Sequence, residues 1–414
     1  MKALNSLAPQ FKSNLPARHR IAKILKFVFQ SATAIGIAML VLLLLTVLNN
    51  LVGIVAIVNT IEPETFAING IPLEDLPKKE IIQIIETNLS KGMIRQLTRE
   101  KALEDFNQQE LFNIVQEKVI KPQIEGTWSL VDSLFKRQEI QEEVMQKFPL
   151  ANLEWKSWFS LRFILASASS DPLQAGVRTA LLGSLLTILI TLLVAFPMGV
   201  GAAIYLEEYA GDTWLNRVIM INISNLAGVP SIIYGMLGLL LFVRGLQPLT
   251  SGAIFGVNDP ATANGRTILS AGLTLALLVL PLIIINAQEA IRSVPESLRQ
   301  ASLGLGATQW QTIWHHVLPS ALPGILTGAI LAISRALGET APLVVIGGAT
   351  FINFDPTGLF SKFTILPIQI YQWTARPQAE FKNLAAAAIV LLLIVLLSLN
   401  TAAIVLRNRF SSKI

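Results

Sequence analysis

The feature that most constrains this chain is a series of six long stretches with almost no charged residues. Five of them contain no Asp, Glu, Lys or Arg, and the other is interrupted only by Arg335 and Glu339. A membrane-spanning helix needs roughly 20 consecutive, mostly apolar residues. The sequence therefore predicts six membrane-spanning helices, in residues 27–61, 179–206, 218–243, 267–288, 320–350 and 384–406.

The composition excludes several classes of protein. Apolar residues make up 52% of the chain and charged residues 14%, which is typical of membrane proteins. The sequence has no cysteine, which removes disulfides, thiolate chemistry and cysteine-ligated zinc. Two of its three histidines, His315 and His316, are adjacent and diverge on a helix, so we expect no metal site. The Gly-x-x-x-x-Gly-Lys-Ser/Thr loop that binds nucleotide phosphates does not occur.

The basic residues of the short loops predict how the chain crosses the membrane. Lysines and arginines are in excess in cytoplasmic loops. Twelve basic residues fall on the side that carries both chain ends, among them Arg217, Arg292 and Arg299, whereas the opposite short loops hold five. We therefore expect both termini to be cytoplasmic.

Residues 62–171 differ in composition from the rest of the chain. They hold eighteen acidic and thirteen basic residues, a net charge of −5, whereas the whole chain has a net charge of +5. Apolar residues recur at helical spacing in 76–89 and 111–119. We expect a small, mostly helical domain on the extracytoplasmic side. It either docks or braces a partner, or it is a decoration without a role of its own.

A polar segment separates the fourth apolar stretch from the fifth. Ser293 and Glu296 have the spacing of a capping box and predict a helix that ends before Gly306. A second capping box, Thr308 with Gln311, predicts another short helix before the next span. Two short helices joined by a glycine elbow make a compact knob beneath the membrane, which can dock in a groove of another protein.

The spacing across this segment resembles the coupling loop of ATP-binding-cassette (ABC) importer permeases. The family signature is Glu-Ala-Ala, three residues, Gly, nine residues, Ile, one residue and Leu-Pro. This sequence keeps the spacing and departs at Gln300, Ser302 and His316. Gln300 in place of Glu removes one partner of any ion pair with the ATPase. The resemblance implies ATPase coupling through these residues: Arg299, Gln300, Ala301, Ser302, Gly306, Leu318 and Pro319.

Other segments resemble the PstA-type permease subunit of bacterial phosphate ABC importers. They lie in residues 199–210, 225–235, 335–342 and 366–371. The resemblance implies an all-α, six-helix polytopic membrane protein with the type I ABC importer permease fold. Its domains are then a tail with the first helix (1–61), an extracytoplasmic insertion (62–171) and a five-helix permease core (172–414), with the coupling loop at 289–319. The insertion lies outside the resemblance.

The resemblance also implies the partners and the division of labour. A PstA-type subunit pairs with a PstC-like permease and sits above a dimer of a PstB-like ATPase, which binds ATP and Mg²⁺. A PstS-like binding protein delivers phosphate from outside. This chain is then a transport subunit in the lipid of the bacterial inner (plasma) membrane. It is not an enzyme, has no cofactor of its own, and moves inorganic phosphate into the cytoplasm by alternating access without binding nucleic acid.

Arg335 and Glu339 are the charged residues of the fifth span. Their spacing of four places both on one face of a continuous helix. A charge near the bilayer centre costs ~2.5–3.5 kcal/mol on insertion scales, so it usually faces protein or water and marks a functional site. The guanidinium fork suits phosphate oxygens, Glu339 offsets its charge, and Thr340 adds a hydroxyl. We expect these residues to line the translocation path. A structural ion pair between packed helices is the alternative.

Three further residues are weaker candidates for the path. Arg178, at the outer end of the second span, either attracts phosphate or snorkels to the interface. Ser231 and Tyr234 belong to a kink with small residues in the third span, which either lines the path or only packs helices.

Two other functions are compatible with the sequence. Arginine and backbone donors bind any tetrahedral dianion, so a permease for molybdate or sulfate fits as well as one for phosphate. An autonomous channel or ion-coupled transporter would use Arg335 and Glu339 as a relay. Such a protein has no need of a capped knob.

Overall fold

The computed structural model describes residues 15–411, except for residues 60, 62, 68–71, 99–101, 258–261, 263, 349, 350 and 353. Residues 1–14 and 412–414, which include Lys2, Lys12 and Lys413 of the charge count, lie outside the described residues.

Among the described residues, five helices are long and apolar enough to cross a membrane, and two shorter helices joined at a sharp bend make a sixth when they are counted as one span. The broken span consists of α9 (Trp214–Ala227) and of α10 (Ser231–Gly238) with its helical continuation to Gly245, bent by 105° at the break between them. The six predicted spans are therefore confirmed, and the predicted kink of the third is a complete break. The long helices are α1 (Leu15–Asn49), α8 (Arg178–Ile204), α12 (Ile268–Arg292), α15 (Leu318–Gly338) and α18 (Ala379–Ser411).

Helix α12 lies at the centre of the bundle, and 67% of its most apolar window is buried. Its closest neighbour is α8, because glycines let the two backbones approach. A Cβ at Gly199 would lie 2.6 Å from Cγ2 of Ile283, and a Cβ at Gly272 would lie 2.6 Å from Ile190. These contacts fix the register of α8 against α12.

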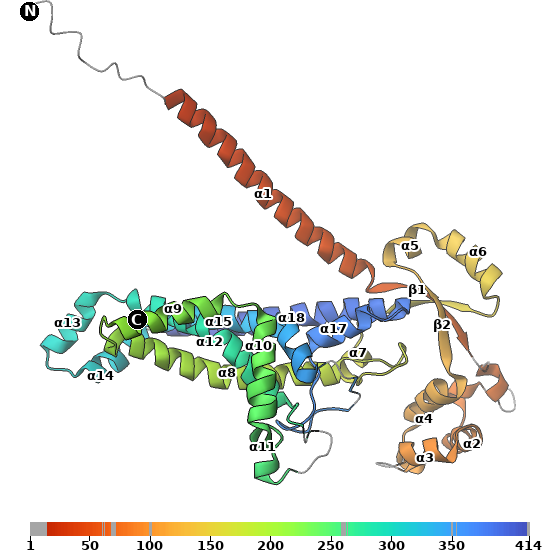
Figure 1. The fold of residues 1–414 in the computed structure, drawn as a ribbon. Coiled ribbons are helices and arrows are strands. Elements are labelled where there is room, and N and C mark those ends of the chain that lie inside the picture. The colour runs from red at the N-terminus through yellow and green to blue at the C-terminus, as the bar shows by residue number, and fades with distance from the viewer. Residues whose placement is uncertain are drawn as a thin grey trace, which may run out of the picture.

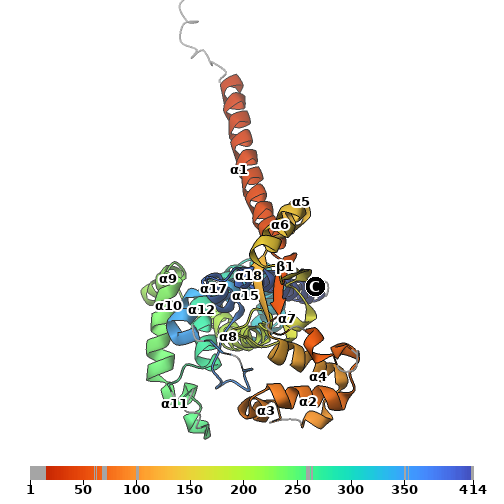
Figure 2. The ribbon, with the colours of Figure 1, turned by 90° about the vertical axis from the view of Figure 1, so that its right-hand side faces the viewer.

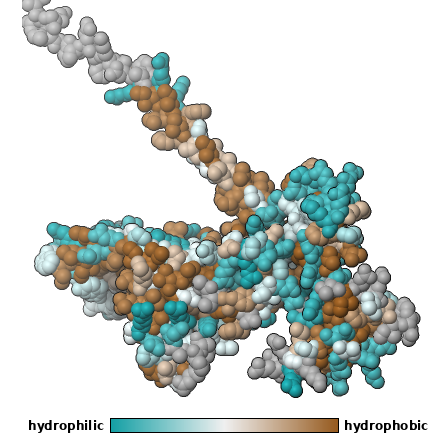
Figure 3. Space-filling model, turned by 45° about the vertical axis from the view of Figure 1, so that its right-hand side comes forward, coloured by the Kyte–Doolittle hydropathy of each residue, from teal (hydrophilic) through white to brown (hydrophobic). Residues whose placement is uncertain are grey.

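Helix α1 lies apart from the bundle. Only 6% of its most apolar window is buried, and Figure 1 shows it running away from the other helices at a steep angle. Its surface is apolar over most of its length (Figure 3). Such a helix needs lipid or another chain around it.

A three-stranded antiparallel sheet lies at the end of α1. Its strands are β1 (Val52–Asn59), β2 (Pro122–Thr127) and β3 (Asn152–Ser157), in the order β2-β1-β3. Strand β1 corrects the prediction that the first membrane segment runs through residue 61. The helix ends at Asn49, and the β-branched run that follows pairs with two strands of the insertion. Hydropathy alone cannot separate a buried strand from the end of an apolar helix.

The rest of the insertion is helical, as the spacing of apolar residues predicts. Ile81, Ile85 and Leu111 are fully buried in one cluster between α2 and α4. Figure 2 shows α2, α3 and α4 on one side of the bundle and α10 with α11 on the other. The helices of the insertion are α2 (Lys78–Asn88), α3 (Lys91–Leu97), α4 (Gln108–Ile114), α5 (Leu130–Phe135), α6 (Arg137–Lys147) and α7 (Leu161–Leu165). The shorter helices of the core are α11 (Gln247–Thr250), α13 (Glu296–Gly304), α14 (Gln309–Thr312), α16 (Ala341–Leu343) and α17 (Leu366–Thr374).

Candidate functional site

Helices α13 and α14 form the predicted knob, at the end of the bundle opposite the insertion (Figure 1). The chain turns between them at Gly306, whose φ of +85° lies in the left-handed region that favours glycine. A Cβ at this position would meet nothing within 4 Å, so the backbone angle, and not a lack of space, requires glycine. The predicted glycine elbow is confirmed.

One of the two predicted capping boxes is present. At α14, Thr308 Oγ1 accepts from the backbone N–H of Gln311 at 3.3 Å, and the Thr308 N–H donates to Gln311 Oε1 at 2.9 Å. The box predicted at Ser293 is wrong, because α13 begins after Pro295 without a side-chain cap. Ser293 still belongs to the end of α12, and its hydroxyl donates back to the carbonyl of Ala290 at 2.7 Å.

A partly buried ion pair fastens the knob to the membrane bundle. Arg299 of α13 donates from Nη2 and Nε to Glu208 Oε1 at 2.7 and 3.1 Å. The same guanidinium donates to the carbonyls of Val294 and Ile291 at 2.7 and 3.0 Å. The side chains of Arg299 and Glu208 are only 14% and 8% exposed, and hydrogen bonds to Glu208 raise the pKa of Arg299. The guanidinium of Arg299, which was predicted to contact the ATPase, thus finds its hydrogen-bond partners within this chain.

A second ion pair lies beside the first. Arg292 donates from Nε and Nη2 to the two carboxylate oxygens of Glu207, both at 2.9 Å. Its side chain is 68% exposed, so solvent weakens this pair more than the first. We call the two ion pairs the clamp. Glu207 and Glu208 were not among the predicted site residues. Two adjacent carboxylates at the end of a span, on the side of the arginines, are the sequence signal that could have identified them.

Hydrogen bonds also join the two helices of the knob to each other and to α8. The hydroxyls of Ser302 and Thr312, both buried, lie 2.9 Å apart and share a hydrogen bond. Gln309 donates its side-chain amide to the backbone carbonyl of Glu208. The knob is therefore built as one unit with the end of α8, along a cavity of about 710 Å³ that the clamp residues line.

The knob exposes large apolar side chains. Leu305 is 91% exposed at the elbow, and Trp310 and Trp314 stack with ring centroids 5.5 Å apart while 56% and 53% exposed. Gln300 and Ala301 of the signature are exposed as well, whereas Ser302 is buried. Stacked, exposed tryptophans are typical of a docking surface, because large aromatic side chains dominate interface energetics.

Within the membrane segments, the structure corrects the predicted relation between Arg335 and Glu339. Helix α15 ends at Gly338, and Glu339 has extended backbone angles of −82° and 114°. The two side chains therefore do not share a face of one helix, and no hydrogen bond or ion pair joins these two described residues. Pro342, in the first turn of α16, cannot donate a backbone hydrogen bond to the preceding turn, which accounts for the break.

Most of the predicted path residues gather around this break. Tyr234 is buried and donates its hydroxyl to the carbonyl of Leu226 at 2.7 Å. Gly235, its neighbour, packs directly on Pro342, since a Cβ there would lie 2.6 Å from the proline Cα. Arg335 is exposed on the surface of this chain, and the remaining residues of the group are half-buried: Ser231, Glu339 and Thr340.

Arg178 lies away from this group, at the first turn of α8. Its Nε lies 2.8 Å from Asp355 Oδ2, and the neighbouring Thr179 donates to Asp355 Oδ1 at 2.9 Å. Arg178 is therefore half of an ion pair that ties α8 to the segment before α17.

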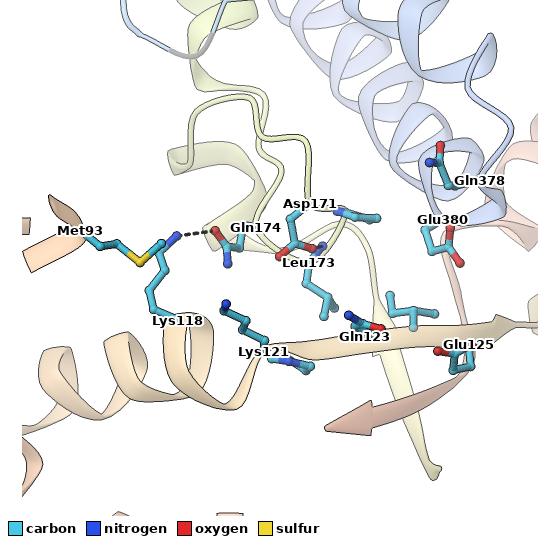
Figure 4. Close-up of a pocket in the computed structure, with 13 residues that line it drawn as sticks. Met93, Lys118, Lys121, Gln123, Glu125, Asp171, Leu173, Gln174, Gln378 and Glu380 are labelled. Atoms are coloured by element: carbon cyan, nitrogen blue, oxygen red, sulfur yellow. Dashed lines mark hydrogen bonds between the residues drawn. The ribbon is translucent and has the colours of Figure 1, made fainter. Parts of the chain in front are cut away.

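A separate crevice of about 680 Å³ lies between the insertion and the core (Figure 4). Lys118 donates to Gln174 Oε1 at 3.0 Å across it. Its lining holds two lysines and three carboxylates, those of Glu125, Asp171 and Glu380. This balance of charge does not favour an anion.

Comparisons with known proteins identify relatives of this chain. Residues 195–414 match the family described as binding-protein-dependent transport system inner membrane component. The chain is 36% identical over 218 residues to the probable ABC transporter permease protein YqgI of Bacillus subtilis, covering 52% of this chain and 68% of that protein. It is 33% identical over 276 residues to the phosphate transport system permease protein PstA 1 of Mycobacterium tuberculosis, covering 64% and 84%. It is also 33% identical over 269 residues to the phosphate transport system permease protein PstC of Pasteurella multocida, covering 60% and 79%.

Proposed function

The chain belongs to the family of binding-protein-dependent transport system inner membrane components, and from that membership we propose that it is the PstA-type subunit of an importer of inorganic phosphate. The family makes it a permease subunit of an ABC importer in the inner membrane. Several relatives at about one third identity carry the name of phosphate permeases, which supports phosphate as the substrate. Movement by alternating access follows from the proposal.

The observation that carries the proposal is the clamped knob. A docking element that transmits movement must present a binding surface to its partner protein. It must also be fixed to the membrane helices that move. The apolar face around Trp310 and Trp314 meets the first condition, and the Arg299–Glu208 pair meets the second. We propose that a PstB-like ATPase dimer, with its ATP and Mg²⁺, binds this face. This chain then needs no catalytic residue and no cofactor of its own. Gln300, Ala301 and Gly306 would meet the ATPase, whereas Ser302, Leu318 and Pro319 would hold the knob.

The exposed apolar helices support a second permease as partner. Almost all of helix α1 is exposed in this chain, and Leu331, one turn before Arg335 on α15, is 63% exposed. We propose that a PstC-like subunit covers this side and that the path runs between the two permeases. A PstS-like protein would deliver phosphate at the opposite end from the knob. The C-terminus lies at the knob end (Figure 1), which supports a cytoplasmic position for the termini.

Arg335 is the residue best suited to meet the anion. It carries a planar fork of donors, is exposed on the side where we place the second permease, and has the Tyr234 ring nearby. Glu339, Thr340 and Ser231 would complete a polar ring around the helix break, and Glu339 keeps the anion from being trapped. Arg178, already paired with Asp355, would serve at the entrance only. A purely structural Arg335, paired with an acid of the second permease, is the competing role.

The experiment that tests the proposal is ATP hydrolysis by the assembled complex in lipid nanodiscs. The chain is co-expressed with its permease and ATPase partners, and binding protein is added empty or loaded. Stimulation by the phosphate-loaded form is the expected result. Stimulation only by a molybdate- or sulfate-loaded protein would keep the ABC permease and change the substrate. Failure to assemble with any ATPase would overturn the coupling role of the knob.

A further inference from the structure

The short helix α5 of the insertion presents an apolar face to the exterior. Val131, Leu134 and Phe135 are 51%, 60% and 82% exposed and lie at helical spacing of three and four, so they share one face. We call these three residues the α5 face. On the other side of the helix, buried Ser133 accepts a hydrogen bond from the N–H of Ile54 in β1 at 2.8 Å. The α5 face therefore points away from the sheet that holds the helix.

Helix α5 is fastened to the end of the first membrane helix. Asn49, the last residue of α1, accepts with Oδ1 from the N–H of Val131 at 2.8 Å. The charge-free part of α1 before it, residues 27–48, holds 22 residues. At ~1.5 Å each they span about 33 Å, close to the thickness of the hydrocarbon core. Asn49 therefore lies where the apolar part of the bilayer ends, and the first turn of α5 lies at the same level.

The residues around the α5 face suit a membrane boundary. Lys136 and Arg137 follow the face directly and are exposed, and Trp155 of β3, which pairs with Ile54, is 48% exposed. Basic and tryptophan side chains are enriched at the level of the lipid headgroups. The next helix, α6, is more polar on its outer side, where Gln141 and Glu142 are exposed beside Met145, which is 74% exposed.

We propose that the α5 face inserts into the headgroup boundary of the bilayer leaflet opposite the knob and holds the insertion at the membrane surface. The occupant is lipid, because the face is fastened directly to the end of α1, whose exposed apolar surface itself needs lipid or a second chain around it. The second permease or a binding protein would be the competing occupants. The proposal rests on membrane insertion of α1 alone and is independent of the transported substrate.

The chain has no cysteine, so a single introduced thiol can be labelled without removing any native one. The test uses Phe135→Cys, with Leu134→Cys as a second position and Gln141→Cys as the matched control on α6. All three side chains are exposed, so the fold should tolerate the changes. Each variant carries an environment-sensitive fluorophore and is reconstituted in nanodiscs with its partner permease. Quenching is then measured with lipids labelled near the headgroup and with iodide in the water.

Lipid quenching at positions 134 and 135, with protection from iodide, is the expected result, while the label at 141 responds to iodide alone. Equal iodide quenching at 135 and 141 would overturn the proposal, because the face would then lie in water. Protection of position 135 from both quenchers would overturn it as well, since a protein would then cover the face. Neither result depends on whether phosphate stimulates ATP hydrolysis.

Discussion

The carboxylate of Glu208 and the guanidinium of Arg299, 91 residues apart in sequence, form an ion pair that joins the helical turn after α8 (Tyr205–Tyr209) to the first helix of the knob. The side chains of Arg299 and Glu208 are 14% and 8% exposed, so solvent screens their attraction only in part. The same guanidinium also binds two backbone carbonyls at the end of α12. A displacement of α13 is therefore passed to both α8 and α12.

Removing this pair should uncouple the knob from the membrane helices. Arg299→Ala leaves the Glu208 carboxylate without its partner, and leaving one charge of a buried pair unpaired costs on the order of 3–5 kcal/mol. We expect the binding protein to lose most of its stimulation of ATP hydrolysis in nanodiscs. Arg292→Ala is the matched control, because its pair with Glu207 is largely exposed and should matter much less. Equal losses in both variants would mean that the buried pair has no special role.

The knob should tolerate alanine at Gly304 and not at Gly306. Gly306→Ala forces an alanine into φ of +85°, at a cost of about 1–2 kcal/mol. Gly304→Ala lies at the end of α13, where a Cβ meets nothing within 4 Å, and should be neutral or slightly stabilising. We expect weaker retention of the ATPase subunit on the purified permease only for the change at 306. Loss of the ATPase with both variants would point to a requirement for small size instead of backbone angle.

Arg335 should be needed for transport and not for assembly. With Arg335→Ala we expect phosphate uptake into proteoliposomes to fall at least about tenfold, which corresponds to roughly 1.4 kcal/mol. Arg335→Lys keeps the charge without the fork and should recover part of the uptake. Leu331→Ala, one turn earlier on the same exposed side of α15, is the control for lost packing. Normal uptake by an assembled Arg335→Ala complex would assign the residue a purely structural role.

Lys156 should make the insertion less stable at neutral pH than at alkaline pH. Burial lowers the pKa of Lys156 from 10.5, against the opposing effect of Glu154 and Asp171. The unfolded chain then holds this proton to higher pH than the folded one, so stability rises with pH between the two pKa values. We expect Lys156→Met to raise the unfolding temperature at about pH 7, with the gain shrinking as pH approaches the unfolded pKa. Lys147→Met, whose side chain is 62% exposed, should show no such trend. A gain that grows with pH would contradict the assignment.

Much of the knob could be predicted from the sequence because its signals are local. The elbow at Gly306 depends on one backbone angle, and the cap at Thr308 on a partner three residues away. The box at Ser293 failed for an equally local reason, since α12 still includes this turn and uses the hydroxyl first. A capping pattern in the sequence does not show to which of two consecutive helices the residue belongs.

Which charged residues pair with one another could not be predicted from local sequence signals. The prediction for Arg335 and Glu339 assumed a continuous helix, and the helix ends between them. Glu207 and Glu208 were passed over because nothing near them in sequence pairs with them; their partners lie 85 and 91 residues away. Strand β1 was taken for part of the first helix because a strand buried on both faces is as apolar as a membrane segment.

The sequence by itself determined the membrane spans, the position of the knob and the family, because apolar length and residue spacing are properties of short segments. Only the tertiary structure decided which charges meet. Glycines of α8 and α12 set how closely these helices approach, and that approach brings Glu208 to Arg299. It also decided that β1 leaves the first span to pair with β2 and β3, since strand pairing depends on segments that only the folded chain brings side by side.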